Sequence, residues 1–311
     1  MKVLVTGAGG FIGRPLVDSL LKDGIQVRVL AQASHTLPAA WKNLVEVAIG
    51  DLTVAATLVP AVADCEVVYH LAGEVRNHAK MWAVNKEGSE HLVEASHKAG
   101  VRRFVYLSSV GVLGSKGGEG RVDEMTPPQP RNLYEESKLA GEAAALCRHA
   151  ERGLQVKVVR PSIVYGEGRQ PRDDSFLRWI RAIRNGQFIM LGRDYMSSYV
   201  YIGDVVAACR FVEQSDRTGG QCFIVNEPVS LTCFVDEAAR LLGIKAPPVL
   251  PRAVGSLAAG LLRLTGRFSS LYNRTLYSMD RLSQLGFNLH YQYPEGLHRT
   301  LDWYRSMKYL P

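Results

Sequence analysis

Residues 6–13 read TGAGGFIG, and this stretch decides the fold because it stands between a strand-like segment and a helix-like one. Residues 2–5 are rich in β-branched side chains, and residues 11–21 have the apolar spacing of an amphipathic helix. The glycines at 7, 10 and 13 then allow a tight turn, close approach of the backbone to a pyrophosphate, and close packing of helix on strand. Unpaired amides at the helix start would hold the anion. A purely structural turn is the alternative, but the strand–turn–helix context favours phosphate binding.

The composition is that of a globular chain with a large core. The chain has 311 residues, of which 47% are hydrophobic, and this length suggests one large domain or two unequal ones. Met1 leads straight into the first expected strand, so we expect no signal peptide. No apolar run reaches the roughly 18 residues of a membrane-spanning helix, and the longest candidate, residues 253–262, stands between Arg252 and Arg263. We therefore expect a cytoplasmic protein without a transmembrane segment.

Charge and cysteine content narrow the classes of partner. A formal net charge of +7 is compatible with nucleic acid, a membrane surface or an anionic substrate. The chain lacks basic repeats and basic stretches interleaved with aromatic residues, so we expect an anionic small molecule and no nucleic acid. The 5 cysteines are widely spaced without a metal-ligand pattern, which predicts small core residues in a reducing compartment and no metal site. The oligomeric state stays open, with a homodimer as one option.

The second expected strand, residues 25–30, bears on the choice of cofactor. Dinucleotide sites of this kind often place an Asp or Glu at the end of that strand to bind the adenosine ribose, whereas sites for a 2′-phosphate prefer basic or hydroxyl groups. Residues 31–35 contain no carboxylate, and Gln32 stands at this position. Groups that could surround a phosphate are Arg14, Ser34, His35 and Lys42. We expect NAD or NADP, with NADP slightly favoured, and the alternative is that these are ordinary loop residues.

Strand-like and helix-like segments alternate along the first two thirds of the chain. Further strands are expected at residues 45–49, 67–69, 104–107, 156–160 and 221–225, and helices at 81–99 and from about 133. This alternation predicts an α/β fold of the Rossmann type, a doubly wound parallel sheet with a smaller C-terminal substrate-binding lobe. We assign residues 1–165, completed by about 198–227, to the dinucleotide-binding domain, and 166–197 and 228–311 to the substrate-binding lobe. Residues 111–130 are expected to form a long loop, with a lid as one option.

Tyr134 and Lys138 form the strongest chemical pair in the sequence. They stand four residues apart on an expected helix and therefore share a face. An ammonium beside a phenol favours the phenolate, as does the cationic nicotinamide ring of an oxidised cofactor, and lowering the pKa of a tyrosine from about 10 to about 7 needs roughly 4 kcal/mol. Tyr134 could then move the proton of an alcohol while the cofactor exchanges hydride, with Ser109 donating to the substrate oxygen. The alternative is an ordinary helix surface.

Several landmarks in a fixed order make this combination specific. They are TGAGGFIG at 6–13, GDL at 50–52, HLAG at 70–73, YLSSVGVLG at 106–114 and YEESK at 134–138. Three further segments fit the same pattern, namely VNKEG at 84–88, VRPSIVYG at 159–166 and YVYIGDV at 199–205. With these motifs the sequence resembles the extended short-chain dehydrogenase/reductases, the family of NAD-dependent epimerases and dehydratases, over nearly its whole length.

The resemblance implies roles for individual residues. The catalytic set that it implies is Ser109, Tyr134 and Lys138, with Lys138 also bonding the nicotinamide ribose. The residues implied to contact the cofactor, from its pyrophosphate to its adenine and nicotinamide ends, are Gly7, Gly10, Phe11, Ile12, Gly13, Gln32, Asp51, Leu52, Leu71, Ala72, Asn85, Tyr134, Lys138 and Pro161. Of these, Asp51 and Leu52 are expected at the adenine, and Asn85 and Pro161 near the nicotinamide half.

Two departures from the family pattern bear on the substrate. Sugar-nucleotide epimerases of this family commonly have Asn where this chain has Ile163, and an Arg for the substrate diphosphate where it has Ser197. Against these departures, five arginines crowd the start of the substrate-binding lobe, and Arg169 and Arg172 are the candidates to hold a diphosphate. The other three, Arg178, Arg181 and Arg184, have the spacing of a solvated helix face. Relatives that act on steroids, flavonols or other ketones also have segments like VRPSIVYG.

The sequence thus leads to an NAD(P)-dependent oxidoreductase or epimerase acting at a secondary alcohol or ketone, with a nucleoside-diphosphate sugar as the leading substrate. A first alternative is a reductase or dehydrogenase of a hydrophobic ketone, of the 3β-hydroxysteroid or dihydroflavonol type. An apolar helix expected at residues 253–264 would suit such a substrate. A second alternative, of another class, is a non-catalytic NAD(P)-sensing binding protein, and the retained Ser109, Tyr134 and Lys138 argue against it.

Overall fold

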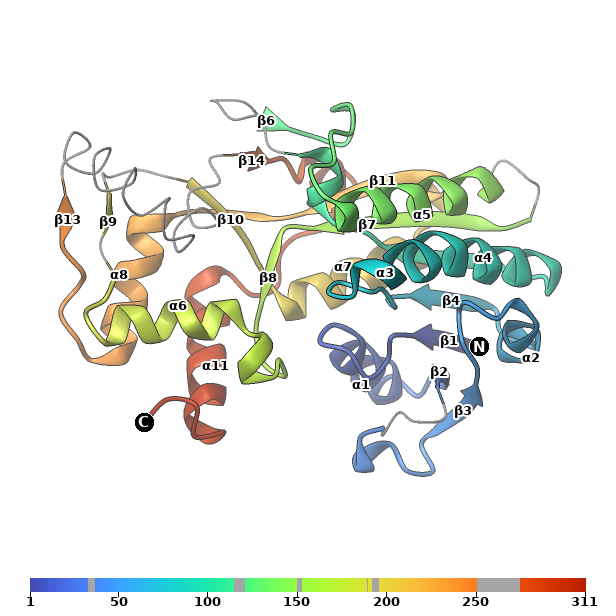
Figure 1. Cartoon of the computed structure of the whole chain (residues 1–311), viewed down its shortest axis with the longest axis horizontal. Coiled ribbons are helices and arrows are strands. Elements are labelled where there is room, and N and C mark those ends of the chain that lie inside the picture. The colour runs from blue at the N-terminus through green and yellow to red at the C-terminus, as the bar shows by residue number, and fades with distance from the viewer. Residues whose placement is uncertain (33–36, 115–120, 150–152, 189, 192–195, 251–274) are drawn as a thin grey trace.

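A seven-stranded sheet runs through the centre of the computed structural model, which describes residues 1–32, 37–114, 121–149, 153–188, 190–191, 196–250 and 275–311. Every pair of neighbouring strands is parallel, in the order β11-β7-β5-β4-β1-β2-β3 (Figure 1). The strands are β1 (Lys2–Thr6), β2 (Gln26–Ala31), β3 (Val45–Ile49), β4 (Val67–His70), β5 (Arg103–Leu107), β7 (Gln155–Pro161) and β11 (Gln221–Val225). The order runs outward in both directions from β1, which confirms the expected doubly wound, Rossmann-type fold.

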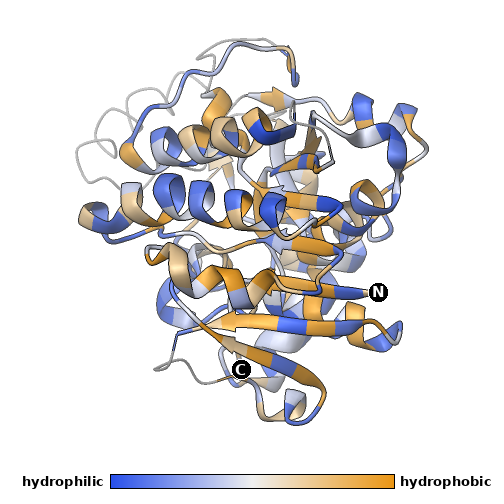
Figure 2. Cartoon of the chain, turned by 90° about the vertical axis from the view of Figure 1, so that its right-hand side faces the viewer, coloured by the Kyte–Doolittle hydropathy of each residue, from blue (hydrophilic) through white to orange (hydrophobic). Residues whose placement is uncertain are grey.

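Helices cover both faces of this sheet (Figure 1). On one face lie α1 (Gly13–Lys22) and α7 (Ile202–Gln214), and on the other lie α2 (Leu58–Val62), α4 (Gly88–Lys98) and α5 (Leu133–His149). Successive strand residues point to opposite faces, so Val3 and Val5 of β1 pack with α1 and α7, whereas Leu4 packs with the other layer. Figure 2 shows the result, with apolar strands lying between helices that carry hydrophilic residues.

The helix expected at residues 81–99 is interrupted. It consists of α3 (His78–Met81), a π-helical turn η3 (Trp82–Glu87), and α4. The turn packs closely on α5, because a side-chain carbon at Gly141 would lie only 2.1 Å from the carbonyl oxygen of Asn85. Single π-helical turns are uncommon and occur often at functional sites.

A smaller lobe is built around three short strands. β8 (Ile163–Tyr165) pairs in parallel with β10 (Met196–Tyr201), and β10 pairs antiparallel with β12 (Glu227–Ser230). The assignment from sequence placed β8 and most of β10 in the dinucleotide-binding domain, and it predicted neither β10 nor β12 as a strand. Ser197 and Ser198 are buried in β10, so the sequence lacks the apolar alternation by which a half-buried strand is recognised.

Three helices and an aromatic core complete this lobe. The helices are α6 (Ser175–Arg184), α8 (Leu231–Leu242) and α11 (Tyr293–Ser306). Their apolar faces share one core with β8 and β10. Aromatic rings in mutual contact form its centre, namely Tyr165, Phe176, Trp179, Tyr199 and Phe234. Such a core gives the lobe an apolar interior of its own.

The remaining elements are short. They are η1 (Ala39–Trp41), η2 (Ala55–Thr57), η4 (Val110–Leu113), β6 (Arg121–Val122), η5 (Pro171–Asp173), β9 (Met190–Leu191), η6 (Asp216–Thr218), β13 (Val249–Leu250), β14 (Leu276–Tyr277) and α10 (Asp280–Gln284). The loop expected at residues 111–130 therefore contains η4 and β6, and β6 pairs with β14. The helix expected at residues 253–264 lies outside the described residues.

Two expectations from composition can be compared with the structure. Across the described ranges, no helix has the length and apolar character needed to cross a bilayer. All five cysteines are free thiols, but Cys147 and Cys233 are exposed. The expectation of buried core residues is wrong for these two, because each lies on the outward side of its helix, α5 or α8.

Candidate active site

The turn between β1 and α1 admits glycine alone at its critical positions. Gly7 has a φ of +68°, and a side-chain carbon there would lie 2.6 Å from the amide nitrogen of Ala72. At Gly13 the same atom would lie 2.1 Å from the carbonyl oxygen of Gly7. The Gly10 amide donates to that carbonyl at 2.9 Å, which closes the turn. Glycine at positions 7 and 13 therefore lets the turn pack closely on the Ala72 backbone and on itself.

The start of α1 fits a pyrophosphate. Ile12 occupies the N-cap position, no side chain caps the helix, and its first turn contains no acidic residue. The positive end of the helix dipole is therefore available to an anion, while the Arg14 and Leu16 amides donate to the carbonyls of Gly10 and Ile12. Together with the glycine turn, these features fit the diphosphate of a dinucleotide.

The segment after β4 lies against the same turn. Leu71 donates its amide hydrogen to the Thr6 carbonyl at 3.2 Å, and the amide of Ala72 donates to Thr6 Oγ1 at 3.3 Å. Thr6 Oγ1 is also 2.7 Å from Nδ1 of the buried His70. Two of the expected cofactor contacts, Leu71 and Ala72, thus lie at the edge of the sheet where the glycine turn begins.

Gln32 and Asp51 meet at the ends of β2 and β3. Gln32 Nε2 donates to Asp51 Oδ2 at 2.6 Å. Hydrogen bonds from the Thr53 amide and hydroxyl hold the pKa of Asp51 below its usual value. A carboxylate therefore lies beside the end of β2, although residues 31–35 contain none. The neighbouring Leu52 is buried and packs against Gly88 at the start of α4.

Ser109 and Tyr134 are distant in sequence, but the loop after β5 and the start of α5 that carry them pack together. Ser109 follows β5 and is the N-cap of η4, where its Oγ accepts the amide hydrogen of Gly111 at 3.1 Å. Gly111 packs on the first turn of α5, because a side-chain carbon there would lie 3.0 Å from Cγ of Glu135. Tyr134 precedes Glu135 in that turn and is half-buried.

Lys138 is buried one helical turn beyond Tyr134. Its Nζ lies 4.2 Å from the ring centre of Tyr106 on β5. It is also close to Asn85, since the carbon that a side chain would add at Gly73 lies 3.2 Å from Asn85 Oδ1 and 3.9 Å from Lys138 Nζ. Burial lowers the pKa of Lys138 to about 7, and the negative charge of Glu142 opposes this shift.

The pKa of Tyr134 moves in the direction opposite to the one expected from sequence. Burial, followed by the charge of Glu135, raises it above its usual value. We expected Lys138 to lower it, but the Lys138 ammonium lies over the Tyr106 ring, so in the protein alone desolvation of the phenol dominates. The positive charge of an oxidised nicotinamide ring, when bound, would shift this pKa in the opposite direction.

Asn85 connects the π-helical turn to α5. Its Nδ2 donates to the Glu74 carbonyl at 2.9 Å and to Ser137 Oγ at 3.0 Å, and Ser137 Oγ donates to the Tyr134 carbonyl at 2.9 Å. The hydroxyl of Ser89 donates to the Asn85 carbonyl at 2.6 Å, and its Oγ is 2.9 Å from His70 Nε2. These bonds join the glycine turn, the π-helical turn and the helix of Tyr134.

His70 in this network is neutral, since burial lowers its pKa to about 3. Sequence reasoning missed its role. The only available signal was its place directly before the leucine and alanine of the motif at 70–73.

A buried ion pair between Glu142 and Arg160 was also missed. Arg160 Nε donates to Glu142 Oε2 at 3.0 Å, and a second guanidinium nitrogen donates to Oε1. Glu142 is one turn beyond Lys138 on α5, and this spacing was the available signal. Arg160 directly precedes Pro161, which ends β7 beside Val225 of β11.

The residues expected to bind the substrate lie in different environments. Arg169 is half-buried with its guanidinium carbon 4.2 Å from the ring centre of Phe11, whereas the Arg172 side chain is 84% exposed and lies near Asp173. Ile163 is 44% exposed on β8, and Ser197 is buried in β10 opposite Val229. Arg169 and Arg172 thus differ in burial, although the charges of both lower the pKa of Asp173.

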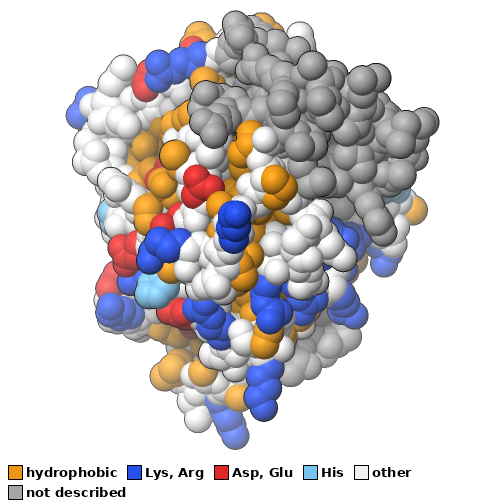
Figure 3. Space-filling model, turned by 90° about the vertical axis from the view of Figure 1, so that its left-hand side faces the viewer, with side chains coloured by type: hydrophobic (Ala, Val, Ile, Leu, Met, Phe, Trp, Pro, Cys, Tyr) orange, Lys and Arg blue, Asp and Glu red, His pale blue; other side chains and the backbone are white. Residues whose placement is uncertain are grey.

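The other three arginines lie on the outer side of α6. Arg178, Arg181 and Arg184 are exposed, and Arg181 also donates to the Tyr309 carbonyl at 2.8 Å. Figure 3, which faces this end of the molecule, shows basic and apolar side chains interspersed on its surface. This agrees with a solvated helix face.

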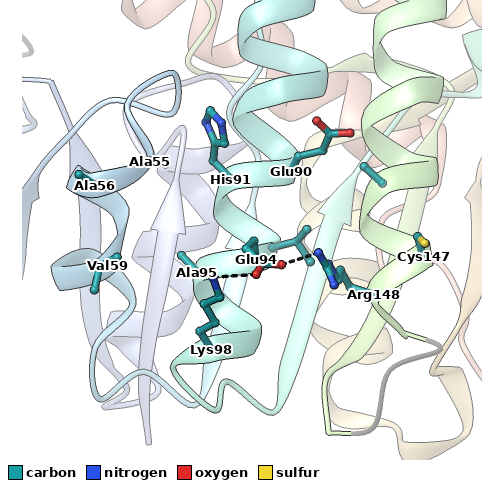
Figure 4. A pocket seen from close by; sticks show the side chains of 12 residues that line it. Ala55, Ala56, Val59, Glu90, His91, Glu94, Ala95, Lys98, Cys147 and Arg148 are labelled. Atoms are coloured by element: carbon teal, nitrogen blue, oxygen red, sulfur yellow. Dashed lines mark ion pairs between the residues drawn. The ribbon is translucent and has the colours of Figure 1, made fainter.

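A hollow of about 720 Å³ lies away from these groups, on the outer side of α2, α4 and α5. Its lining includes Val59, His91 and Cys147, and an ion-pair chain from Lys98 through Glu94 to Arg148 runs along its floor (Figure 4). It contains none of the expected site residues. Among the residues that the structure describes, no cluster of His, Cys, Asp or Glu has the composition of a metal site.

Comparison with known proteins identifies the family. The model of the NAD dependent epimerase/dehydratase family matches residues 3–226. The chain belongs to this family. It is an NAD-dependent enzyme of the extended short-chain dehydrogenase/reductase type, as its motifs predicted.

The proteins similar to this chain include both a hydroxysteroid dehydrogenase and a sugar epimerase. The 3 beta-hydroxysteroid dehydrogenase/Delta 5→4-isomerase of Mycobacterium tuberculosis H37Rv is 31% identical over 292 residues, which are 86% of this chain and 77% of that protein. The N-acetyl-alpha-D-glucosaminyl-diphospho-ditrans,octacis-undecaprenol 4-epimerase of Escherichia coli O157:H7 is 26% identical over 97% of this chain and 94% of its own length. The structure of MoeE5 with UDP-glucose and NAD is 28% identical, with a TM-score of 0.76 and coverage of 99% of this chain and 100% of that chain.

Proposed function

We propose that this family member exchanges hydride between NAD and a secondary alcohol or ketone, with Ser109, Tyr134 and Lys138 as its catalytic set. The observation behind the proposal is the Lys138 ammonium, which is buried beside Asn85 and over the Tyr106 ring. Burying an amine with a pKa of about 7 destabilises a fold, so a purely structural role does not account for it. Strongly perturbed groups of this kind are typical of catalytic sites.

The chemistry divides among these three side chains. When bound, NAD supplies the hydride acceptor and a positive charge at its nicotinamide ring. The phenol oxygen of Tyr134 takes the alcohol proton during oxidation and returns it during reduction. Ser109 donates its hydroxyl hydrogen to the substrate oxygen, and the Gly111 amide, which donates to Ser109 Oγ, fixes its direction. Lys138 binds the nicotinamide ribose and stabilises the phenolate of Tyr134 through its charge.

We propose NAD rather than NADP as the preferred cofactor. The Asp51 carboxylate lies beside the end of β2 through its hydrogen bond with Gln32. Hydrogen bonds from Thr53 lower its pKa and so keep it charged. A negative charge at this place attracts ribose hydroxyls and repels a 2′-phosphate. The slight preference for NADP was predicted from residues 31–35 at the end of β2 alone, whereas the Asp51 carboxylate comes from the end of β3.

For the substrate we propose an apolar secondary alcohol of the hydroxysteroid class. Ser197 is uncharged and also buried, so it cannot pair with a substrate diphosphate, and Ile163 presents an apolar side chain on β8. The similarity to the hydroxysteroid dehydrogenase of M. tuberculosis supports the same class. A nucleoside-diphosphate sugar, the leading substrate from sequence, is the second candidate because the chain is also similar over its whole length to MoeE5, solved with UDP-glucose.

Turnover assays with both substrate classes test this proposal. The protein is incubated with NAD and either a 3β-hydroxysteroid or UDP-glucose, and both NADH formation and the stereochemistry of the sugar are followed. The second readout is needed because an epimerase regenerates its oxidised cofactor. NADH formation with the steroid alone supports the proposal. Sugar epimerisation without net NADH would replace it with the second candidate, and bound NAD without conversion of either class would contradict the proposed substrates.

A further inference from the structure

Arg169 of the smaller lobe lies against the phosphate-binding turn. Its guanidinium carbon is 4.2 Å from the ring centre of Phe11, which belongs to the TGAGGFIG stretch. Phe11 also packs against the core of the smaller lobe. The charged end of Arg169 is thus held beside the turn whose helix, α1, begins at Gly13 without a side-chain cap.

The charge of Arg169 is not matched by an ion pair within the described part of the chain. Asp174, the carboxylate that most raises the pKa of Arg169, is already engaged, because Oδ1 accepts the amides of Phe176 and Leu177 at 3.0 and 3.1 Å and Oδ2 accepts the Tyr304 hydroxyl at 2.6 Å. Burial lowers the pKa of Arg169, and the charge of Asp174 only partly opposes this. A half-buried cation in this situation gains from an anionic ligand.

A second cation lies in the same region. Arg76, in the loop after β4, forms an ion pair with Asp173 of η5 at 2.5 Å. The charge of Arg76 further lowers the pKa of Arg169, and the charge of Asp173 partly opposes this. Arg76–Asp173 and Phe11–Arg169 are both contacts between the larger and the smaller lobe, and the second involves the glycine turn itself.

We propose that Arg169 binds the diphosphate of the dinucleotide at the glycine turn, so that the smaller lobe contributes directly to cofactor binding. A planar guanidinium can donate two parallel hydrogen bonds to a diphosphate, and its aromatic contact with Phe11 holds that plane in place. This inference rests on the proposed dinucleotide site. It assigns to the cofactor a residue that sequence patterns assign to the substrate.

Calorimetric titration of the intact chain with NAD tests whether Arg169 binds the cofactor. Arg169→Met keeps an apolar side chain against Phe11 and removes the charge, and Arg172→Met is the matched control because its side chain is 84% exposed. We expect the dissociation constant for NAD to rise about 10-fold to 100-fold in Arg169→Met, the range for hydrogen bonds to charged groups. Arg172→Met should bind NAD like the wild type.

Further measurements separate the possible outcomes. If Arg169→Met lowers the Tm, Arg169→Lys replaces it, and a weaker NAD affinity is again expected because the forked donor is lost. Unchanged NAD affinity in Arg169→Met would overturn the inference. Weaker binding of UDP to the NAD-loaded variant, with NAD affinity intact, would assign Arg169 to a substrate diphosphate instead. If the wild type itself does not bind NAD, the proposed function fails together with this inference.

Discussion

Replacing Lys138 with Met should make the protein more stable while removing its activity. The Lys138 ammonium is buried, and Glu142, the carboxylate one turn away, is held by Arg160. A pKa of about 7 in place of the ordinary 10.5 corresponds to about 5 kcal/mol, at about 1.4 kcal/mol for each tenfold change in proton affinity. About 5 kcal/mol is therefore an upper limit for the stability that Lys138→Met can gain, because the substitution also removes the favourable contact of the ammonium with the Tyr106 ring.

The dependence on pH distinguishes this cause from a change in packing. Because the pKa of Lys138 is lower in the folded protein, the unfolded chain binds more protons between about pH 7 and pH 10.5. The wild type therefore gains stability as the pH rises through this window, and the destabilisation is fully present below pH 7. Relative to the wild type, Lys138→Met should gain up to about 4 kcal/mol at pH 7 and about 2 kcal/mol at pH 9.

Urea unfolding of both proteins at pH 7 and pH 9 measures this difference. Lys98→Met is a suitable control, because the side chain of Lys98 is 73% exposed and its removal should change stability by no more than about 0.5 kcal/mol at either pH. A Lys138→Met protein that is less stable than the wild type at both pH values would refute the reasoning. So would a gain in stability that is the same at pH 7 and pH 9.

Two further predictions concern the cofactor. Gly13→Ala should abolish measurable NAD binding in calorimetry, because the added carbon would lie 2.1 Å from the Gly7 carbonyl oxygen and must displace the turn. Gly9→Ala is the control and should bind NAD normally, because its added carbon meets no atom within 4 Å. Equal NAD affinities in the two variants would refute this prediction. The wild type should bind NAD at least tenfold more tightly than NADP, about 1.4 kcal/mol, because of the Asp51 carboxylate, and an equal or tighter affinity for NADP would refute the role of that charge.

The main sheet could be predicted because its information is local. Strands such as residues 221–225 are short apolar runs bounded by turn residues, and the structure has β11 at Gln221–Val225. The strand β10 could not be predicted in the same way, because Ser197 and Ser198 lie buried in a sheet whose other strands come from elsewhere in the chain. Local pattern therefore determines the apolar strands of the main sheet, and tertiary pairing determines strands such as β10.

The candidate site shows the same division. The motif positions of Gly7, Gly13 and Lys138 could be read from sequence spacing. The pairing of Gln32 with Asp51 could not, because two strand ends must first be brought together by the sheet. The direction in which the Tyr134 pKa is shifted could not be predicted from sequence either, since it depends on how deeply the phenol is buried and on where the Lys138 ammonium lies.

The most direct test of the central claim is turnover by Tyr134→Phe with its NAD content verified by titration. Phe keeps the packing of the ring and removes the oxygen that transfers the proton, so kcat should fall by about 10² to 10⁴ while NAD still binds. Ser109→Ala is a useful companion, because it should retain NAD and lose part of the hold on the reacting oxygen. Near-normal turnover by NAD-loaded Tyr134→Phe would contradict the proposed mechanism.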